Sequence, residues 1–256
     1  HLSVLCNQMV NFLGIMQNEW AGAQAFSSFD TYLAPFVKAD NLSYPEVKKC
    51  IESFIYGVNT PSRWGTQAPR SNITLDWTVP DDMAEMNAIV GGRETDFKYK
   101  DCRKEMDMIN KAFIETMVEG DANGRGFQYP IPTYSITNDF DWSDTENNRL
   151  LFEMTSKYGT PYFSNYINSD MQPSDVRSMC CRLRLDLREL RKKTGGFFGA
   201  GESTGSVGVV TINMPRIAYL AKDEADFFGK LDHMMDICAR SLKTKREVIT
   251  KLLNQG

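Results

Sequence analysis

The sequence has little histidine, which many metal sites and hydrolase sites need. His1 and His233 are the only two in 256 residues, and they stand near opposite ends of the chain. Zinc sites and Ser-His-Asp triads both place histidine beside other ligands or beside a nucleophile. The sequence therefore disfavours zinc hydrolases and serine hydrolases.

The chain also lacks a basic field and a long apolar run. Its net charge is -4 and its pI is near 5.4, so its overall charge does not attract nucleic acid or an anionic lipid surface. No stretch approaches the roughly 18 apolar residues of a membrane span. The opening HLSVLCNQMVNF lacks the basic flank of a secretory signal. We expect a cytoplasmic protein with no nucleic-acid partner and no membrane partner.

None of the six cysteines forms a C-x-x-C pair. This absence argues against a zinc knuckle or a redox dithiol, and no metal site is predicted. Cys180 and Cys181 are adjacent, and a disulfide between neighbours would close a strained ring. We expect reduced thiols, at Cys6, Cys50, Cys102, Cys180, Cys181 and Cys238.

Apolar residues recur every three to four positions in several stretches, which predicts helices. Residues 2–16 and 46–58 show this spacing, and Ser43 is a candidate N-cap for the second stretch. Further helices are expected over 99–119, 144–158 and 223–254.

Short β-branched or aromatic runs lie between these helices and predict strands. The alternation of strand and helix favours an α/β fold with a parallel sheet. We expect one continuous partial catalytic domain across 1–256, with a helical layer over 1–60, barrel strands over 61–215 and a long helix over 216–256. The five strand candidates are Asn72–Trp77, Phe127–Thr137, Pro161–Ile167, Val176–Leu185 and Val207–Asn213.

The segment from Ser178 to Pro215 carries the most chemical information. The cysteine pair heads a basic stretch, and six glycines follow between Gly195 and Gly208. Glycines at this density let the backbone approach a ligand or another segment closely. Free cysteine also serves as a small buried apolar side chain. On a strand, adjacent side chains face opposite sides, so one cysteine of the pair can enter a cavity.

Several long motifs in this chain resemble the anaerobic, class III ribonucleoside-triphosphate reductases. The resemblance extends over essentially all 256 residues, in the order that the family shows. The motifs are NFLGIMQNEWAGAQAFSSFDTYLAPF, APRSNITLDW, GDANGRGFQYPIPTYSIT, KYGTPYFSNYINSD, SMCCRLRLD and GGFFGAGESTGSVGVVTINMPRI.

The resemblance implies part of a ten-stranded α/β barrel of the glycyl-radical enzyme type, with a finger loop that carries a cysteine at its tip. By motif, Cys181 matches the residue that forms a thiyl radical. This radical takes hydrogen from the 3′ carbon of a ribonucleoside triphosphate, and the 2′ hydroxyl then leaves as water. A sulfur radical needs shielding from water, which a closed barrel supplies. We expect Cys181, and not Cys180, at the tip.

Three further catalytic and binding assignments stay open. Cys180 is either an electron donor or a packing residue. Ser206 stands where some members carry an asparagine that assists the chemistry, and this departure argues against dependence on formate. The sequence leaves the reductant open between formate and a thiol protein. Ser71 and Asn72 open a predicted strand and either bind substrate or act as ordinary turn residues.

The resemblance also implies effectors and partners. ATP and deoxynucleotides are the expected effectors, and a homodimer is expected. The family's glycyl radical and its zinc site of paired cysteines lie on a segment that these 256 residues do not contain, and a radical-SAM activase installs the radical. Five strands cannot close a barrel of ten, so we expect association with a chain that carries the remainder.

A different class of function competes with the enzyme. A catalytically silent nucleotide-binding scaffold would keep the fold and support a separate radical-bearing chain. Such a scaffold has no need for Cys181 in its glycine-rich setting, and this feature favours the enzyme. A two-electron cysteine nucleophile is disfavoured because no histidine base stands near Cys181 in the sequence.

Overall fold

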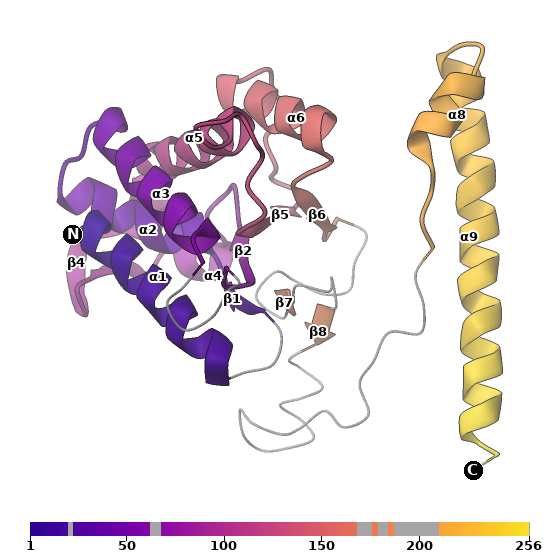
Figure 1. The fold of residues 1–256 in the computed structure, drawn as a ribbon, viewed down its shortest axis with the longest axis horizontal. Helices are drawn as coiled ribbons and strands as arrows, with labels where there is room; N and C mark the ends of the chain where they lie inside the picture. The colour runs from indigo at the N-terminus through magenta and orange to yellow at the C-terminus, as the bar shows by residue number, and fades with distance from the viewer. Residues whose placement is uncertain (20–22, 62–67, 168–175, 179–183, 187–209, 256) are drawn as a thin grey trace. The chain divides into compact units, whose positions relative to one another are not determined.

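The computed structural model describes residues 1–19, 23–61, 68–167, 176–178, 184–186 and 210–255. The chain divides into two compact units, His1–Gly199 and Ala200–Gly256 (Figure 1). Each unit is described by itself. The expectation of one continuous domain stays a prediction.

A four-stranded parallel sheet organises the first unit. Its strands follow the order β1-β2-β5-β6, and each neighbouring pair is parallel. The predicted α/β fold with a parallel sheet is confirmed, and three of the predicted strands match β2, β5 and β6. The strands are β1 (Gln24–Phe26), β2 (Ser71–Leu75), β5 (Ile131–Ile136) and β6 (Tyr162–Asn165).

Five of the helices in this unit pack against one another beside the sheet (Figure 1). They occupy the regions where the apolar spacing predicts helices, except that α2 lies in a segment rich in small and aromatic residues. At the start of α3, Ser43 and Glu46 form a capping box, and the Ser43 N–H donates to Glu46 Oε2 at 2.8 Å. The helices are α1 (Leu2–Glu19), α2 (Phe29–Ala39), α3 (Tyr44–Asn59), α5 (Arg103–Glu119) and α6 (Glu146–Tyr158).

One apolar core joins the helices to one face of the sheet. Ile73 and Leu75 of β2 and Tyr134 of β5 are fully buried in the same cluster as Phe54 and Phe113 of the helices. Because strand side chains alternate, the residues between them face the other side of the sheet. That other face is polar, since Thr74 lies beside Thr133 and Ser135 lies beside Ser164 in the register.

The structure contains several short elements that the sequence pattern does not predict. The expected helical layer over 1–60 contains strand β1, and an antiparallel hairpin precedes α5. Three or four residues give too few periods for a hydrophobic pattern to emerge. The hairpin strands are β3 (Asn87–Val90) and β4 (Arg93–Lys98), and the short helices are α4 (Asp81–Ala84) and the 3-10 helix η1 (Tyr99–Cys102).

The single strand predicted over Val176–Leu185 is wrong. Two three-residue strands, β7 (Val176–Ser178) and β8 (Arg184–Asp186), pair antiparallel instead, with Ser178 opposite Arg184. One continuous strand cannot pair with itself, so the chain direction reverses between them. Residues 179–183, with Cys180 and Cys181, lie outside the described residues.

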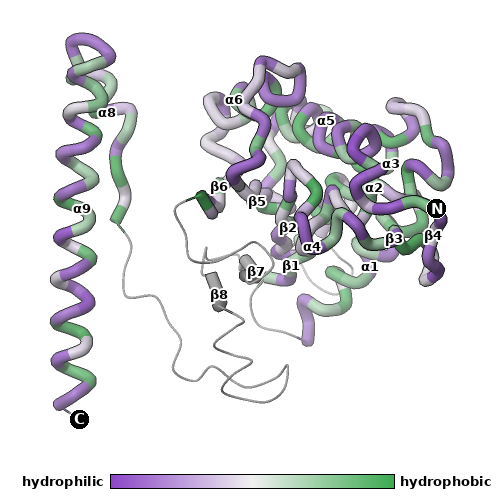
Figure 2. The backbone as a smooth tube through the Cα atoms, turned by 180° about the vertical axis from the view of Figure 1, so that it is seen from behind, coloured by the Kyte–Doolittle hydropathy of each residue, from purple (hydrophilic) through white to green (hydrophobic). Residues whose placement is uncertain are grey.

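The described part of the second unit, residues 210–255, contains α8 (Met214–Leu220) and α9 (Glu224–Leu253). The long helix predicted over 223–254 is confirmed, and hydrophilic and hydrophobic residues alternate along it (Figure 2). The strand predicted over Val207–Asn213 is not found, because 210–213 have no regular structure and 207–209 lie outside the described residues. Asn213 Oδ1 instead accepts the Arg216 N–H at 2.9 Å and caps α8, with Pro215 in the first turn.

The described helices include none that is both long and apolar enough to cross a membrane. The four cysteines in the described part of the chain are free thiols, as predicted. Burial raises the pKa of Cys6 to about 12 and that of Cys102 to about 11. Both thiols therefore stay protonated and unreactive near neutral pH.

Candidate functional site

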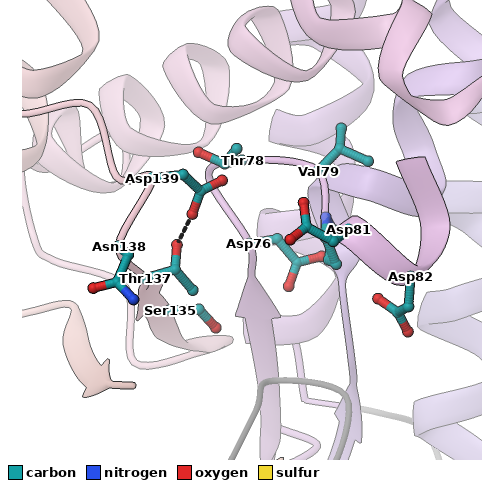
Figure 3. Close-up of a pocket in the computed structure, with 10 residues that line it drawn as sticks. Asp76, Thr78, Val79, Asp81, Asp82, Ser135, Thr137, Asn138 and Asp139 are labelled. Carbon is teal, nitrogen blue, oxygen red and sulfur yellow. Dashed lines mark hydrogen bonds between the residues drawn. The ribbon is translucent and has the colours of Figure 1, made fainter. Parts of the chain in front are cut away.

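A pocket of about 320 Å³ lies at the carboxyl ends of β2 and β5. Figure 3 shows Asp76 at the end of β2, with Asp81 and Asp82 on one side and the residues that follow β5 on the other. Ligands of parallel α/β sheets bind outside the carboxyl ends of the strands. The pocket is lined by Asp76, Thr78, Val79, Pro80, Asp81, Asp82, Ser135, Thr137, Asn138 and Asp139.

Asp76 is the most buried carboxyl group of the pocket wall. The residue is 5% exposed, and Thr31 Oγ1 of α2 donates to its Oδ2 at 2.6 Å. The Ser28 side chain is a second hydrogen-bond partner. The start of α2 therefore fixes a carboxyl group at the end of a neighbouring strand.

A second carboxylate, Asp30 in the first turn of α2, lies fully buried behind Asp76. Its Oδ1 accepts the backbone N–H of Asp76 at 2.8 Å and that of Thr31 at 3.1 Å. Its Oδ2 accepts the backbone N–H of Trp77 at 2.9 Å and the Asn110 side-chain amide at 3.0 Å. Four N–H donors thus surround one carboxylate, which replaces the hydration that burial removes.

The hydrogen bonds that Asp30 accepts coincide with an unusual backbone conformation at Trp77. Trp77 has a φ of 65°, in the left-handed region that a bulky side chain rarely adopts. Its ring stacks on Phe140 at 5.7 Å and meets Tyr134 edge-on at 5.3 Å between centroids. The Asp30 carboxylate and this aromatic packing together hold the chain in a sharp turn where β2 ends.

The polar network continues through the core to β5. Tyr134, fully buried on β5, donates its hydroxyl hydrogen to Asn110 Oδ1 at 2.9 Å, and Asn110 bonds Asp30. The oxygen and the nitrogen of the Asn110 side-chain amide therefore both form hydrogen bonds. The network ties α2, α5, β2 and β5 together directly beneath the pocket.

Burial raises the pKa of both carboxyl groups in this pair. The pKa of Asp76 rises to about 7, first through burial and then through repulsion by Asp30. Burial also raises the pKa of Asp30, but the four N–H donors oppose that rise. Because both Asp30 oxygens are already occupied by donors, the proton that the pair holds near neutral pH resides on Asp76.

The pocket carries no positive charge of its own. Four aspartates line it, and neither lysine nor arginine is among its lining residues. A polyphosphate needs cations or a cluster of N–H groups, so the described wall does not suit one. No group of three or more histidine, cysteine, aspartate or glutamate side chains within the described ranges could hold a metal ion.

Of the sequence-predicted site residues, the structure describes Ser71 and Asn72, and neither lines this pocket. Cys180, Cys181 and Ser206 lie outside the described residues. Ser71 and Asn72 lie at the opposite, amino end of β2, where both are buried. Ser71 Oγ and Asn72 Oδ1 have no hydrogen-bond partner among the described residues. Their predicted role in substrate binding stays a prediction.

Sequence reasoning missed Asp30 and Asp76, although each carries a signal. Asp76 directly follows the apolar strand SNITL, and Asp30 interrupts the small and aromatic segment AFSSFDTYLAPF. A carboxylate inside such a window is buried at high cost unless it has partners. The partner Asn110 is 80 positions away from Asp30, and no spacing in the sequence connects the two.

The fold and the pocket define an α/β protein with a ligand-sized cavity at the carboxyl edge of a parallel sheet. The family profile described as anaerobic ribonucleoside-triphosphate reductase matches residues 1–256. The chain belongs to this family. No curated protein matches it.

Solved structures of anaerobic ribonucleotide reductases are similar to the chain over its whole length. The Thermotoga maritima enzyme with dATP bound in the specificity site is 18% identical, with a TM-score of 0.49, over 100% of this chain and 42% of that one. The same enzyme in complex with dATP and CTP is 18% identical, with a TM-score of 0.47, over 100% and 41%. Another anaerobic ribonucleotide reductase is 22% identical, with a TM-score of 0.46, over 100% and 40%. The chain thus spans about two fifths of the length of these proteins.

Proposed function

We propose that this chain is the catalytic core segment of an anaerobic ribonucleotide reductase that converts ribonucleoside triphosphates to deoxyribonucleotides by thiyl radical chemistry. The observation that carries the proposal is the family match across all 256 residues. The parallel sheet with a pocket at its carboxyl edge supports it, because the substrate of such a fold binds there.

Cys181 is the proposed radical residue. It follows Cys180 in the sequence and is assigned by its place in the motif SMCCRLRLD. A glycyl radical on a segment outside these 256 residues supplies the unpaired electron. The Cys181 sulfur then accepts the 3′ hydrogen atom of the ribose, and the 2′ hydroxyl leaves as water.

Supporting roles follow for the other predicted residues. Cys180 is assigned as a source of electrons, and Ser206 as a polar group near the reacting ribose. Ser71 and Asn72 are assigned to the substrate because they open a strand, and their side-chain oxygens have no hydrogen-bond partner among the described residues. ATP and deoxynucleotides are the proposed effectors, and a second copy or a radical-bearing chain is the proposed partner.

Replacing Cys181 with serine tests this proposal. In the radical-activated assembly with the glycyl-radical segment, Cys181→Ser is expected to reduce turnover to background, because a serine hydroxyl does not form a comparable radical. Nucleotide affinity, measured by calorimetry, is expected to change less than about twofold, since the two side chains differ by one atom. Cys50→Ser, at a half-buried free thiol of α3, is the matched control and is expected to retain activity.

Two results would contradict the proposal in different ways. Turnover by Cys181→Ser would remove that residue from the chemistry. Nucleotide binding by the wild-type chain without any turnover, in an assembly whose radical is present by electron paramagnetic resonance, would favour the silent scaffold instead.

A further inference from the structure

The carboxyl end of β2 carries two buried acids, and only one of them lines the pocket. Asp76 forms part of the pocket wall, whereas Asp30 lies behind it and touches the pocket only through the backbone of residues 76 and 77. Burying a carboxylate completely costs folding free energy, so fold stability alone does not account for Asp30 at this position.

We propose that Asp30 is a positioning residue that sets both the place and the charge of the Asp76 carboxyl group, so that Asp76 meets a ligand as a hydrogen-bond donor to an uncharged oxygen. The inference rests on the proposed function for the identity of that ligand. It names the ribose hydroxyls, and not the phosphates, as the part of a nucleotide that this pocket takes.

The place of Asp76 follows from the hydrogen bonds of Asp30. Its two oxygens hold the N–H groups of Asp76 and Trp77 at 2.8 and 2.9 Å, which fixes consecutive peptides through the left-handed turn. Thr31, the next residue of α2, then meets the Asp76 side chain at 2.6 Å. One helical turn of α2 therefore controls both the backbone and the side chain of Asp76.

The charge of the Asp76 carboxyl group depends on how the N–H donors are shared between Asp30 and Asp76. Asp30 receives four N–H groups and keeps its negative charge, which repels a second charge on Asp76. Asp82 of α4 adds further repulsion, and Asp81 and Asp139 also line the cavity. The described residues facing Asp76 from α2, α4 and the segment after β5 thus include carboxylates and hydroxyls but no cation. Burial raises the pKa of Asp76 to about 7, which agrees with a protonated group.

A protonated carboxyl group selects the ligand by its chemistry. It donates one hydrogen bond and accepts others, as a ribose hydroxyl can also do. Phosphate oxygens would meet three further carboxylates at Asp81, Asp82 and Asp139. Ser135 and Thr137 add hydroxyl groups to the same wall, so an uncharged polyhydroxyl group fits better than an anion.

The test is a titration of the Asp76 carboxyl carbon by nuclear magnetic resonance in the ligand-free chain. The wild-type midpoint is expected near 7. Asp30→Asn is expected to lower it by more than one pH unit, because the repelling charge is gone. Thr31→Val removes one donor to Asp76 and keeps the side-chain volume, so it is expected to raise the midpoint by about one unit.

These variants separate positioning from stability. If Asp30→Asn fails to fold, the wild-type midpoint still decides whether Asp76 is protonated, and Thr31→Val confirms that the titrating signal belongs to Asp76. A purely structural Asp30 would change the melting temperature and leave the Asp76 midpoint of the folded protein unchanged. Asp96→Asn, on exposed strand β4, is the control and is expected to leave the midpoint in place. An Asp76 midpoint near 4 in the wild-type chain would overturn the inference.

The ligand assignment is tested with cytidine and with inorganic triphosphate as probes. Cytidine carries ribose hydroxyls and no phosphate, and it is expected to shift the Asp76 signal and to bind about tenfold or more weakly at pH 8.5 than at pH 6. The assignment would be overturned if cytidine left the Asp76 signal unchanged at pH 6. It would also be overturned if inorganic triphosphate shifted that signal more than cytidine does. The proposed function fails separately, through turnover by Cys181→Ser, which involves no titration of Asp76.

Discussion

Replacing Gly120 with alanine is expected to destabilise the first unit by about 3 kcal/mol or more. Gly120 ends α5 with a φ of 76° and a ψ of -165°, a backbone that glycine alone adopts readily. A Cβ atom there would lie 2.6 Å from the Arg125 carbonyl oxygen. That oxygen accepts the Asp121 N–H at 2.8 Å, so it cannot move away without breaking the turn.

Gly124 in the same loop provides the matched control. Its φ is 71°, but an added Cβ would meet no atom within 4 Å. Gly124→Ala is therefore expected to cost only the backbone strain, about 1 to 2 kcal/mol. Urea unfolding of both variants measures the difference, which isolates the steric contact at Gly120. Equal losses of unfolding free energy would show that the loop relaxes around the added methyl group.

This loop matters for the site because it delivers the chain from α5 to β5. Asp121 accepts the backbone N–H groups of Asn123 and Arg125 at 2.8 and 2.9 Å, which closes the turn. The strand that follows supplies Ser135 to the pocket and Tyr134 to the buried network. A defect at Gly120 is thus expected to affect the position of β5 as well as the stability of the fold.

Periodicity predicted the elements that bury a whole face. The helices at 2–19, 44–59 and 103–119 each bury apolar residues at helical spacing, and the pattern is visible without a structure. Strand β1 has three residues, and its pairing with β2 depends on contacts between distant segments. The predicted strand at 207–213 ends at Asn213, and Met214 and Pro215 follow; together these three residues are a helix-start signal that the apolar run before them obscured.

The candidate site was less accessible to sequence reasoning than the fold. The resemblance directs attention to Cys180, Cys181 and Ser206, which lie outside the described residues. The pocket depends instead on Asp30, whose partners come from three elements separated by up to 80 positions. A buried carboxylate can be suspected from its apolar neighbours, but its hydrogen-bond donors are fixed only by the packing of α2 against α5 and β2.

The free energy of unfolding is expected to fall as the pH rises from about 5 to about 8. The pKa of Asp76 is about 7 in the folded chain, against the ordinary value of 3.8 that an aspartate has in an unfolded chain. Between these values the folded state binds more protons than the unfolded state, so stability decreases with increasing pH. A shift of this size corresponds to roughly 4 kcal/mol in full, of which about 2 to 3 kcal/mol is lost between pH 5 and pH 8.

The substitution Asp76→Asn is expected to remove most of this pH dependence and to stabilise the chain at pH 8. An asparagine oxygen can still accept the Thr31 hydroxyl hydrogen, and the amide carries no charge to repel Asp30. Asp96→Asn, at an exposed position on β4, is the control and is expected to keep the wild-type slope. Urea unfolding at pH 5, 6, 7 and 8 measures all three proteins. If the stability of the wild-type chain rises over this range, Asp76 is ionised in the folded state. The proton would then have to be assigned to a group outside the pocket.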